Sequence, residues 1–151
     1  MMRLAGQPAW WIKTGVTLVL AVWAVVHPVP VDLAVFCAVA VAIAGAAINL
    51  WHYRLLKVAG KAEAPTTLVT QGGLWPFVRH PMYLGEGLLM LALAVMARGP
   101  SIYLMFVGWI AIVRLALAED RAMGERFPQA HVKWRQRAGL LFPKLRGRPA
   151  E

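Results

Sequence analysis

Four apolar stretches, separated by polar or breaker-rich segments, dominate the hydrophobic pattern of the chain. They span residues 10–26, 33–51, 83–97 and 102–118. A helix needs about 20 apolar residues to cross the hydrocarbon core of a bilayer, and lipid requires each backbone polar group to be paired within its own element. The pattern therefore predicts an all-α, polytopic membrane protein with about four transmembrane helices.

Proline and glycine positions support these boundaries. Pro28 and Pro30 end the first stretch, and the Arg-Gly-Pro sequence at residues 98–100 predicts a tight reversal between the third and the fourth. A cleaved signal peptide is an alternative interpretation of the first stretch, but Trp23 near its end and the further apolar stretches favour a retained helix. Gly45 and the many alanines of the second stretch predict close packing against a neighbouring helix.

Two further segments lie outside the apolar stretches. Residues 57–81 are polar and rich in glycine and proline, so we expect a loop whose length favours a functional role. The fourth helix can continue to Phe127, and Pro128 suits the first turn of another helix. That helix carries Val132 and Trp134 among basic residues, which predicts a cytoplasmic amphipathic helix at the membrane interface.

The composition leaves little room for a separate soluble domain. Of 151 residues, 60% are hydrophobic and 15% are charged, whereas soluble domains average about 45–50% apolar and about 25% charged residues. We expect one membrane domain, in which residues 1–56 form an N-terminal transmembrane helix pair and residues 57–151 form the catalytic part. The single cysteine, Cys37, excludes an intrachain disulfide and a multi-cysteine zinc site.

The charge distribution predicts how the chain is oriented. Sixteen basic and seven acidic residues give a formal net charge of +9. Most basic residues lie near the start of the chain, in the long loop and in the tail, so the positive-inside rule places both termini and the loop in the cytoplasm. The inner membrane of a cell is the expected location. Anionic lipid head groups explain the positive charge without a nucleic-acid partner, and we expect no bound metal.

The first candidate for chemistry lies where the long loop meets the third helix. His80 and Tyr83 flank Pro81 and Met82 and are three residues apart, so their rings fall on one helical face and can contact one ligand. An interfacial cluster without a ligand is the alternative, because arginine, histidine and tyrosine all favour head-group depth.

The second candidate is an acidic pair at the end of the fourth helix. Glu119 and Asp120 follow an apolar segment, where lipid and the negative helix terminus both disfavour an unpaired carboxylate. A positive partner is therefore expected. Arg79 or Arg121 could supply it as an ordinary ion pair, and a bound cationic ligand is the other possibility.

Taken together, residues 68–143 resemble the catalytic half of the isoprenylcysteine carboxyl methyltransferase family, which consists of integral membrane enzymes that use S-adenosylmethionine. The resemblance rests on an ordered set of short motifs. These are Leu68-Val69-Thr70, Gly73 with Trp75, Arg79-His80-Pro81-Met82-Tyr83-Leu84-Gly85, Glu119-Asp120, Arg126-Phe127 and Leu141-Phe142-Pro143.

The resemblance implies a pocket for S-adenosylmethionine between the loop and the helix ends. Aromatic faces and a carboxylate suit the sulfonium cation of this cofactor, and apolar loop residues suit its adenosyl group. The residues implied to line the pocket are Thr67, Leu68, Val69, Trp75, His80, Pro81, Met82, Tyr83 and Glu119.

The acceptor side matches the family less well. Arg114 lies one position from the arginine that holds the substrate carboxylate in eukaryotic members, but we favour a structural ion pair between Arg114 and Glu86. Either Glu86 or Asp120 could deprotonate an amine or thiol acceptor. Asp120, His131 and Trp134 replace a glutamate and two tyrosines that are usual in the family. The candidate catalytic residues are thus Glu86, Arg114 and Asp120.

These observations predict a membrane methyltransferase that acts on a lipophilic or amphipathic acceptor, such as an isoprenylcysteine-type carboxylate or a related lipid. An NADPH-dependent sterol or enone reductase is an alternative, because that membrane group resembles the same histidine-proline-tyrosine motif. A non-enzymatic membrane adaptor, in which the long loop is only a connector, is a second alternative.

Overall fold

The computed structural model describes residues 7–27, 29–58 and 68–144. Within them the chain forms no named strand and the helices α1 (Pro8–Val26), α2 (Leu33–Val58), α3 (Pro81–Ala97), α4 (Ser101–Arg126) and α5 (Pro128–Arg137). α1, α2 and α4 are long and apolar enough to cross a membrane, and α3 is a shorter apolar helix. The predicted all-α, polytopic membrane architecture is confirmed.

Most helix boundaries follow the prolines and the apolar pattern, but α2 is longer than predicted. It continues past residue 51 to Val58, and in this extension Leu55 and Leu56 pack against the buried cluster that the loop and α5 form. Pro81 and Pro128 occupy the first turns of α3 and α5, as their fixed φ angle predicts.

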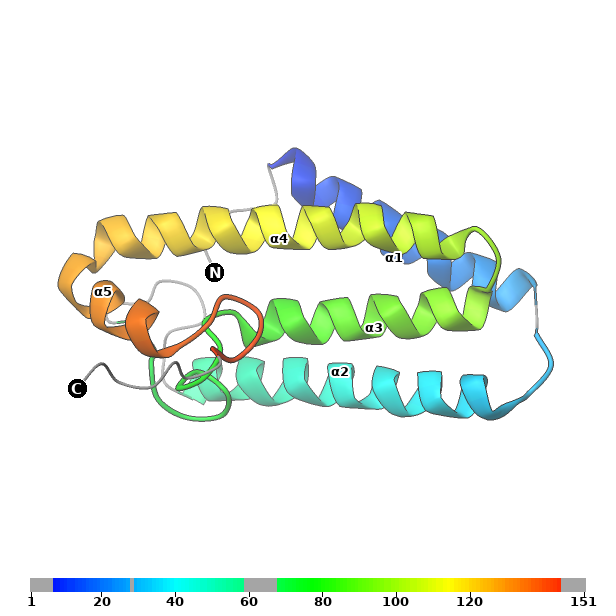
Figure 1. The fold of residues 1–151 in the computed structure, drawn as a ribbon, viewed down its shortest axis with the longest axis horizontal. Coiled ribbons are helices and arrows are strands. Elements are labelled where there is room, and N and C mark those ends of the chain that lie inside the picture. The colour runs from blue at the N-terminus through cyan, green and yellow to red at the C-terminus, as the bar shows by residue number, and fades with distance from the viewer. Residues whose placement is uncertain (1–6, 28, 59–67, 145–151) are drawn as a thin grey trace.

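α3 lies at the centre of the bundle, between α2 and α4, and α1 crosses behind α4 at an angle (Figure 1). α3 packs against all three of these helices. With 17 residues, α3 is at the lower end of the range of about 17–25 residues for a membrane-spanning helix. In contrast to α1, which buries only Leu20, α3 buries Pro81, Tyr83, Gly85, Gly87, Met90, Ala92, Ala94 and Ala97.

Two glycines allow the backbones of α2 and α3 to touch. A Cβ atom added to Gly45 would lie 2.6 Å from the carbonyl oxygen of Gly85, and one added to Gly85 would lie 2.7 Å from the carbonyl oxygen of Gly45. Both distances are too short for real side chains, so the glycines are required by this contact. The predicted close packing at Gly45 is confirmed, and it fixes α2 beside the helix that carries much of the candidate site.

The turn end of the bundle, where α1 leads to α2 and α3 to α4, contains one ion pair. Arg98 donates a hydrogen bond to the Asp32 carboxylate and thereby lowers the pKa of Asp32 below its usual value. Arg98 and Gly99 have φ angles of 54° and 56°, which produce the predicted tight reversal. Both charged side chains are exposed, so this pair contributes little to stability.

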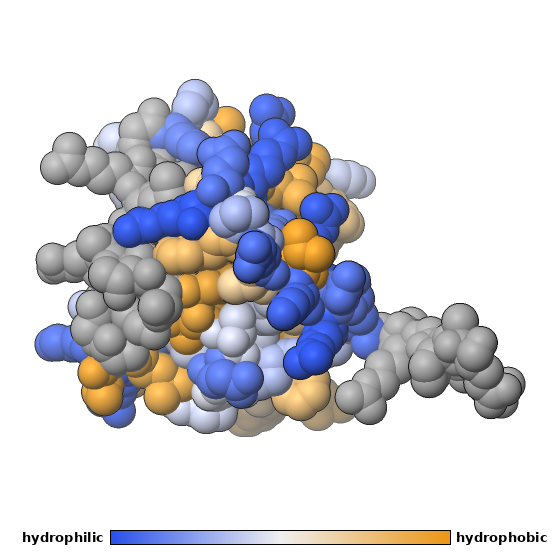
Figure 2. All heavy atoms as spheres, turned by 90° about the vertical axis from the view of Figure 1, so that its left-hand side faces the viewer, coloured by the Kyte–Doolittle hydropathy of each residue, from blue (hydrophilic) through white to orange (hydrophobic). Residues whose placement is uncertain are grey.

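The opposite end, called the site end here, is where α2 finishes, α3 begins and α4 leads into α5. Figure 2 shows hydrophilic side chains gathered over this end. The segment after α5 pairs with the loop before α3 through backbone hydrogen bonds. The N–H group of Arg79 donates to the carbonyl oxygen of Gly139 at 2.8 Å, and that of His80 donates to the carbonyl oxygen of Leu140 at 3.0 Å. In return, the N–H group of Gly139 donates to the carbonyl oxygen of Phe77 at 2.9 Å. These hydrogen bonds hold the His80 backbone against the C-terminal segment.

We expect Gly45→Ala to lower the melting temperature of the detergent-purified protein, because the added methyl group collides with the carbonyl of Gly85. Overpacking of this kind typically costs about 1–3 kcal/mol. Gly15→Ala on α1 is the matched control, because nothing lies within 4 Å of a Cβ at Gly15, and alanine favours a helix over glycine. Equal melting temperatures for the two variants would contradict the close contact between α2 and α3.

Candidate functional site

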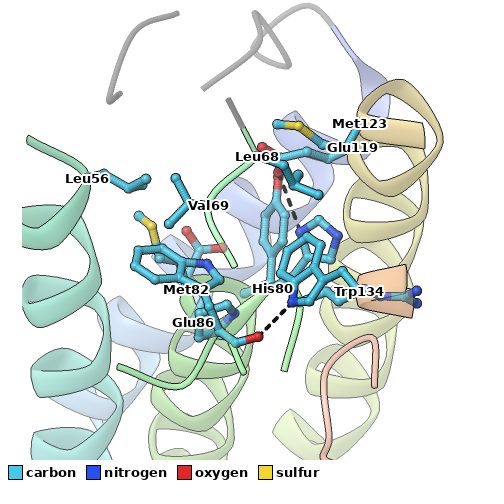
Figure 3. A pocket seen from close by; sticks show the side chains of 13 residues that line it. Leu56, Leu68, Val69, His80, Met82, Glu86, Glu119, Met123 and Trp134 are labelled. Atoms are coloured by element: carbon cyan, nitrogen blue, oxygen red, sulfur yellow. Dashed lines mark hydrogen bonds and ion pairs between the residues drawn. The ribbon is translucent and has the colours of Figure 1, made fainter. Parts of the chain in front are cut away.

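A cavity at the site end is lined by residues from separate parts of the chain (Figure 3). They come from the end of α2, the loop before α3, the first turns of α3, the end of α4, and α5. No single element encloses the cavity, so its shape depends on how these segments pack. The lining residues are Leu56, Leu68, Val69, Trp75, Arg79, His80, Pro81, Met82, Tyr83, Glu86, Glu119, Met123 and Trp134.

Most residues predicted to hold a cofactor line this cavity. Thr67, one member of the predicted set, lies outside the described residues. Cofactor binding by the remaining members stays a prediction, but the tertiary structure places all of them around one cavity. They are Leu68, Val69, Trp75, His80, Pro81, Met82, Tyr83 and Glu119.

Aromatic rings and a carboxylate lie together in the cavity. The ring centroids of His80 and Tyr83 are 5.8 Å apart, in agreement with the prediction from their three-residue spacing. Nδ1 of His80 lies 3.8 Å from Oε2 of Glu119, which brings the start of α3 to the end of α4. Trp75 and Tyr83 are each only 6% exposed. Such surroundings offer a cation both ring faces and negative charge.

Asp120 lies behind the cavity wall, at the centre of a buried polar cluster. Its Oδ1 atom is 3.3 Å from Arg79 Nε, 3.0 Å from His131 Nε2 and 3.6 Å from His80 Nε2. Of the two arginines considered as ion-pair partners for the acidic segment, Arg79 is the one that contacts Asp120. Asp120 is not among the residues that line the cavity, and three groups surround one of its oxygens, which is the environment of a structural carboxylate; its role as a base for the acceptor stays a prediction.

Arg79 retains hydrogen-bonding capacity at the cavity. Burial lowers the pKa of its guanidinium, and the nearby Asp120 opposes that change. Nε of Arg79 and Nε2 of His80 face Oδ1 of Asp120, whereas Nη1 of Arg79 is buried and has neither a hydrogen bond nor an ion pair among the described residues. A buried donor without a partner is costly, so Nη1 of Arg79 favours a ligand that brings an anionic oxygen.

Trp134 of α5 forms part of the cavity wall and was not predicted to do so. Its Nε1 donates a 2.7 Å hydrogen bond to the carbonyl oxygen of Trp75, and His131, one turn earlier, contacts Asp120. These two contacts attach α5 to the loop and to α4. The sequence did carry a signal for this role. His131 and Trp134 are three residues apart and therefore share one face of an otherwise polar helix, and both are buried.

His52 on α2 is a second residue whose role the sequence analysis missed. It is fully buried; its Nδ1 is 2.7 Å from the carbonyl oxygen of Ile48, and its Nε2 accepts a hydrogen bond from Leu74 N–H at 2.9 Å. Because a carbonyl only accepts and an amide N–H only donates, Nδ1 carries the proton and the ring is neutral. The ring also packs edge-on against Trp75, which orients that wall of the cavity.

Glu86 lines the cavity, but its partner is not the one predicted. Lys13 of α1 donates a 2.8 Å hydrogen bond to Glu86, so the predicted pair between Glu86 and Arg114 is wrong. Arg114 is exposed and lines a separate groove between α1 and α4, because Ile112 and Ala116 occupy the buried face of α4. Arg114 is therefore not positioned to hold a substrate in the cavity.

The metal-binding potential of the described residues and the similarity of the chain to known proteins both bear on the nature of this site. Within the part of the chain that the structure describes, no group of three or more histidine, cysteine, aspartate and glutamate side chains could hold a metal ion. A family model described as phospholipid methyltransferase matches residues 33–130. No curated protein and no solved structure matches the chain. The matched range runs from the start of α2 into α5 and contains every lining residue except Trp134.

We expect Asp120→Asn to lower the free energy of unfolding by about 3–5 kcal/mol, because Arg79 would keep its charge in a buried position without an anionic partner. Thermal unfolding in detergent measures this loss. Glu125→Gln is the matched control, since Glu125 is an exposed acidic residue of the same helix with no ion pair among the described residues. If both variants unfold at the same temperature, Asp120 does not have the central role assigned to it.

Proposed function

The chain belongs to the phospholipid methyltransferase family, whose model matches more than half of its length, and on this premise we propose that it is a membrane methyltransferase that uses S-adenosylmethionine. The acceptor is a lipophilic or amphipathic molecule. Family membership favours this function over the NADPH-dependent reductase and the adaptor, and the apolar helices α1, α2 and α4 support a site within reach of the bilayer.

The observation that carries the proposal is the combined chemistry of the cavity. The Glu119 carboxylate and the rings of Trp75 and Tyr83 suit a sulfonium cation. The unpaired Nη1 donor of Arg79 suits the carboxylate of the same cofactor. Apolar loop residues in the lining suit its adenosyl group. The residues present therefore fit each part of S-adenosylmethionine.

When bound, this cofactor supplies a methyl group whose bond to sulfur breaks as the acceptor forms a bond to the methyl carbon, and the sulfur leaves as a neutral thioether. The protein must hold the two reactants in line, and such positioning is worth about 7–11 kcal/mol. Trp75, Tyr83 and Trp134 are each less than 10% exposed, so they exclude water from the cavity. A dry site favours a reaction in which the positive charge on sulfur disappears.

Glu86 favours an amine as the acceptor. Together with Glu119 it gives the cavity two carboxylates from different helices, which attract an ammonium head group and repel a carboxylate. The hydrogen bond from Lys13 positions Glu86. Glu86 would accept the proton that the ammonium loses, and the resulting neutral amine would have the lone pair needed to form the bond to the transferred methyl group. We therefore favour a phospholipid amine, in line with the description of the family, over an isoprenylcysteine-type carboxylate.

The proposed orientation places the site end at the cytoplasmic face of the membrane. Most basic residues lie in the segments at this end, as the positive-inside rule requires. Both termini are then cytoplasmic, and the amphipathic α5 lies in the head-group layer beside the cavity. A lipid acceptor can reach such a site without leaving the bilayer.

We expect the purified protein to bind S-adenosylmethionine, and His80→Ala and Glu119→Ala to weaken binding at least about tenfold, because each removes a buried polar or charged contact. Isothermal titration calorimetry in detergent measures the affinity. Glu125→Gln serves as the control and should bind normally. If the natural protein does not bind, the cofactor proposal fails; if it binds and both variants bind equally well, only the site assignment fails.

We expect a radiolabelled methyl donor, incubated with the protein and extracted membrane lipids, to label the lipid fraction with a product that resists mild base. An N-methyl amine is stable under these conditions, whereas a methyl ester releases its label. Glu86→Gln should lower the labelling more than it lowers cofactor affinity, because it removes the base and not the cofactor contacts. Base-labile label would instead identify a carboxylate acceptor.

A further inference from the structure

A groove between the start of α1 and the outer face of α4 shares no lining residue with the cavity described above. Its walls are apolar and open, with Ile12, Ile110 and Leu117 exposed by 47%, 62% and 40%. Arg114 and Arg121 line the same groove. It therefore combines an apolar surface with positive charge toward the site end of the bundle.

The two arginines lie on one face of α4 and have no anionic partner in the described part of the chain. They are seven residues apart, which is two helical turns or about 10.5 Å along the axis. None of the ion pairs among the described residues involves either of them. Glu86, the partner expected for Arg114, is instead paired with Lys13. Both guanidinium groups are thus available for an external anion.

The position of Arg114 favours such an anion. It lies within an apolar helix that is long enough to span the membrane, and a guanidinium at this depth is costly unless it reaches polar groups. A planar guanidinium binds a phosphate through two parallel hydrogen bonds. From the arginines the groove continues along Val107 and Ile110 toward the turn end, which is the direction that an acyl chain takes from its head group.

We propose that this groove binds an anionic phospholipid of the surrounding bilayer, with its phosphate between Arg114 and Arg121 and one acyl chain along the apolar wall. Net negative charge on the lipid matches the two unpaired cations, whereas a zwitterionic lipid would bring a competing positive group. Because the groove and the cavity have no lining residue in common, this lipid is not the methyl acceptor. The lipid then lies along the line where α1 packs against α4.

The test compares phosphatidylglycerol with phosphatidylcholine of the same acyl chains, added to the full-length protein in neutral detergent. Phosphatidylglycerol should raise the melting temperature by about 5 °C or more and remain bound in native mass spectrometry. Arg114→Gln/Arg121→Gln should weaken this binding at least about tenfold. Arg54→Gln/Lys57→Gln removes the same amount of charge from exposed positions at the end of α2 and should leave the lipid effect unchanged.

Three results would overturn the proposal. Equal stabilisation by the two lipids would mean that net charge is not recognised, and an unchanged effect in Arg114→Gln/Arg121→Gln would mean that lipid binds elsewhere. Equal stabilisation by glycerol phosphate would identify a site for free anions and not for lipid. The double variant Arg114→Lys/Arg121→Lys tests whether loss of binding reflects misfolding. It keeps both positive charges, so phosphatidylglycerol should still raise its melting temperature by part of the amount seen with the natural protein.

Discussion

Three side chains from two distant segments converge on Oδ1 of Asp120, and the shape of the candidate site depends on this convergence. Arg79 and His80 come from the loop before α3, and His131 comes from α5. A buried ion pair adds little net stability compared with apolar packing, but removing one partner is expensive. The cluster therefore specifies where the loop and α5 must lie, and the cavity forms in front of it.

Packing within the bundle sets the positions of the helices that meet at this cluster. The glycine contact between α2 and α3 brings the two backbones together, and residues 68–80, which precede α3, lie at the site end. There Leu74 bonds to His52, and Trp75 accepts a hydrogen bond from Trp134. The apolar interior thus positions α3, and directional hydrogen bonds then position the cavity wall.

The candidate site could be predicted in part because its motifs are local. The spacing of His80 and Tyr83 on one helix determines that their rings lie near each other, whatever else the chain does. The pairing of Glu86 could not be predicted, because Lys13 and Arg114 are both basic residues within apolar helices. Which of them reaches Glu86 depends on the rotation of α1 and α4 about their axes, and hydrophobic patterns alone leave that rotation open.

The amino-acid sequence by itself determined that this chain forms apolar helices bounded by prolines, that an amphipathic helix follows them, and that polar chemistry gathers at one end. Those properties depend on hydrophobicity, backbone geometry and charge within short segments. Only the tertiary structure decided that Trp134 and His52 support the cavity, that Asp120 lies behind its wall, and that Arg114 faces outward. These features depend on contacts between residues far apart in the chain, which exist only after the helices have packed.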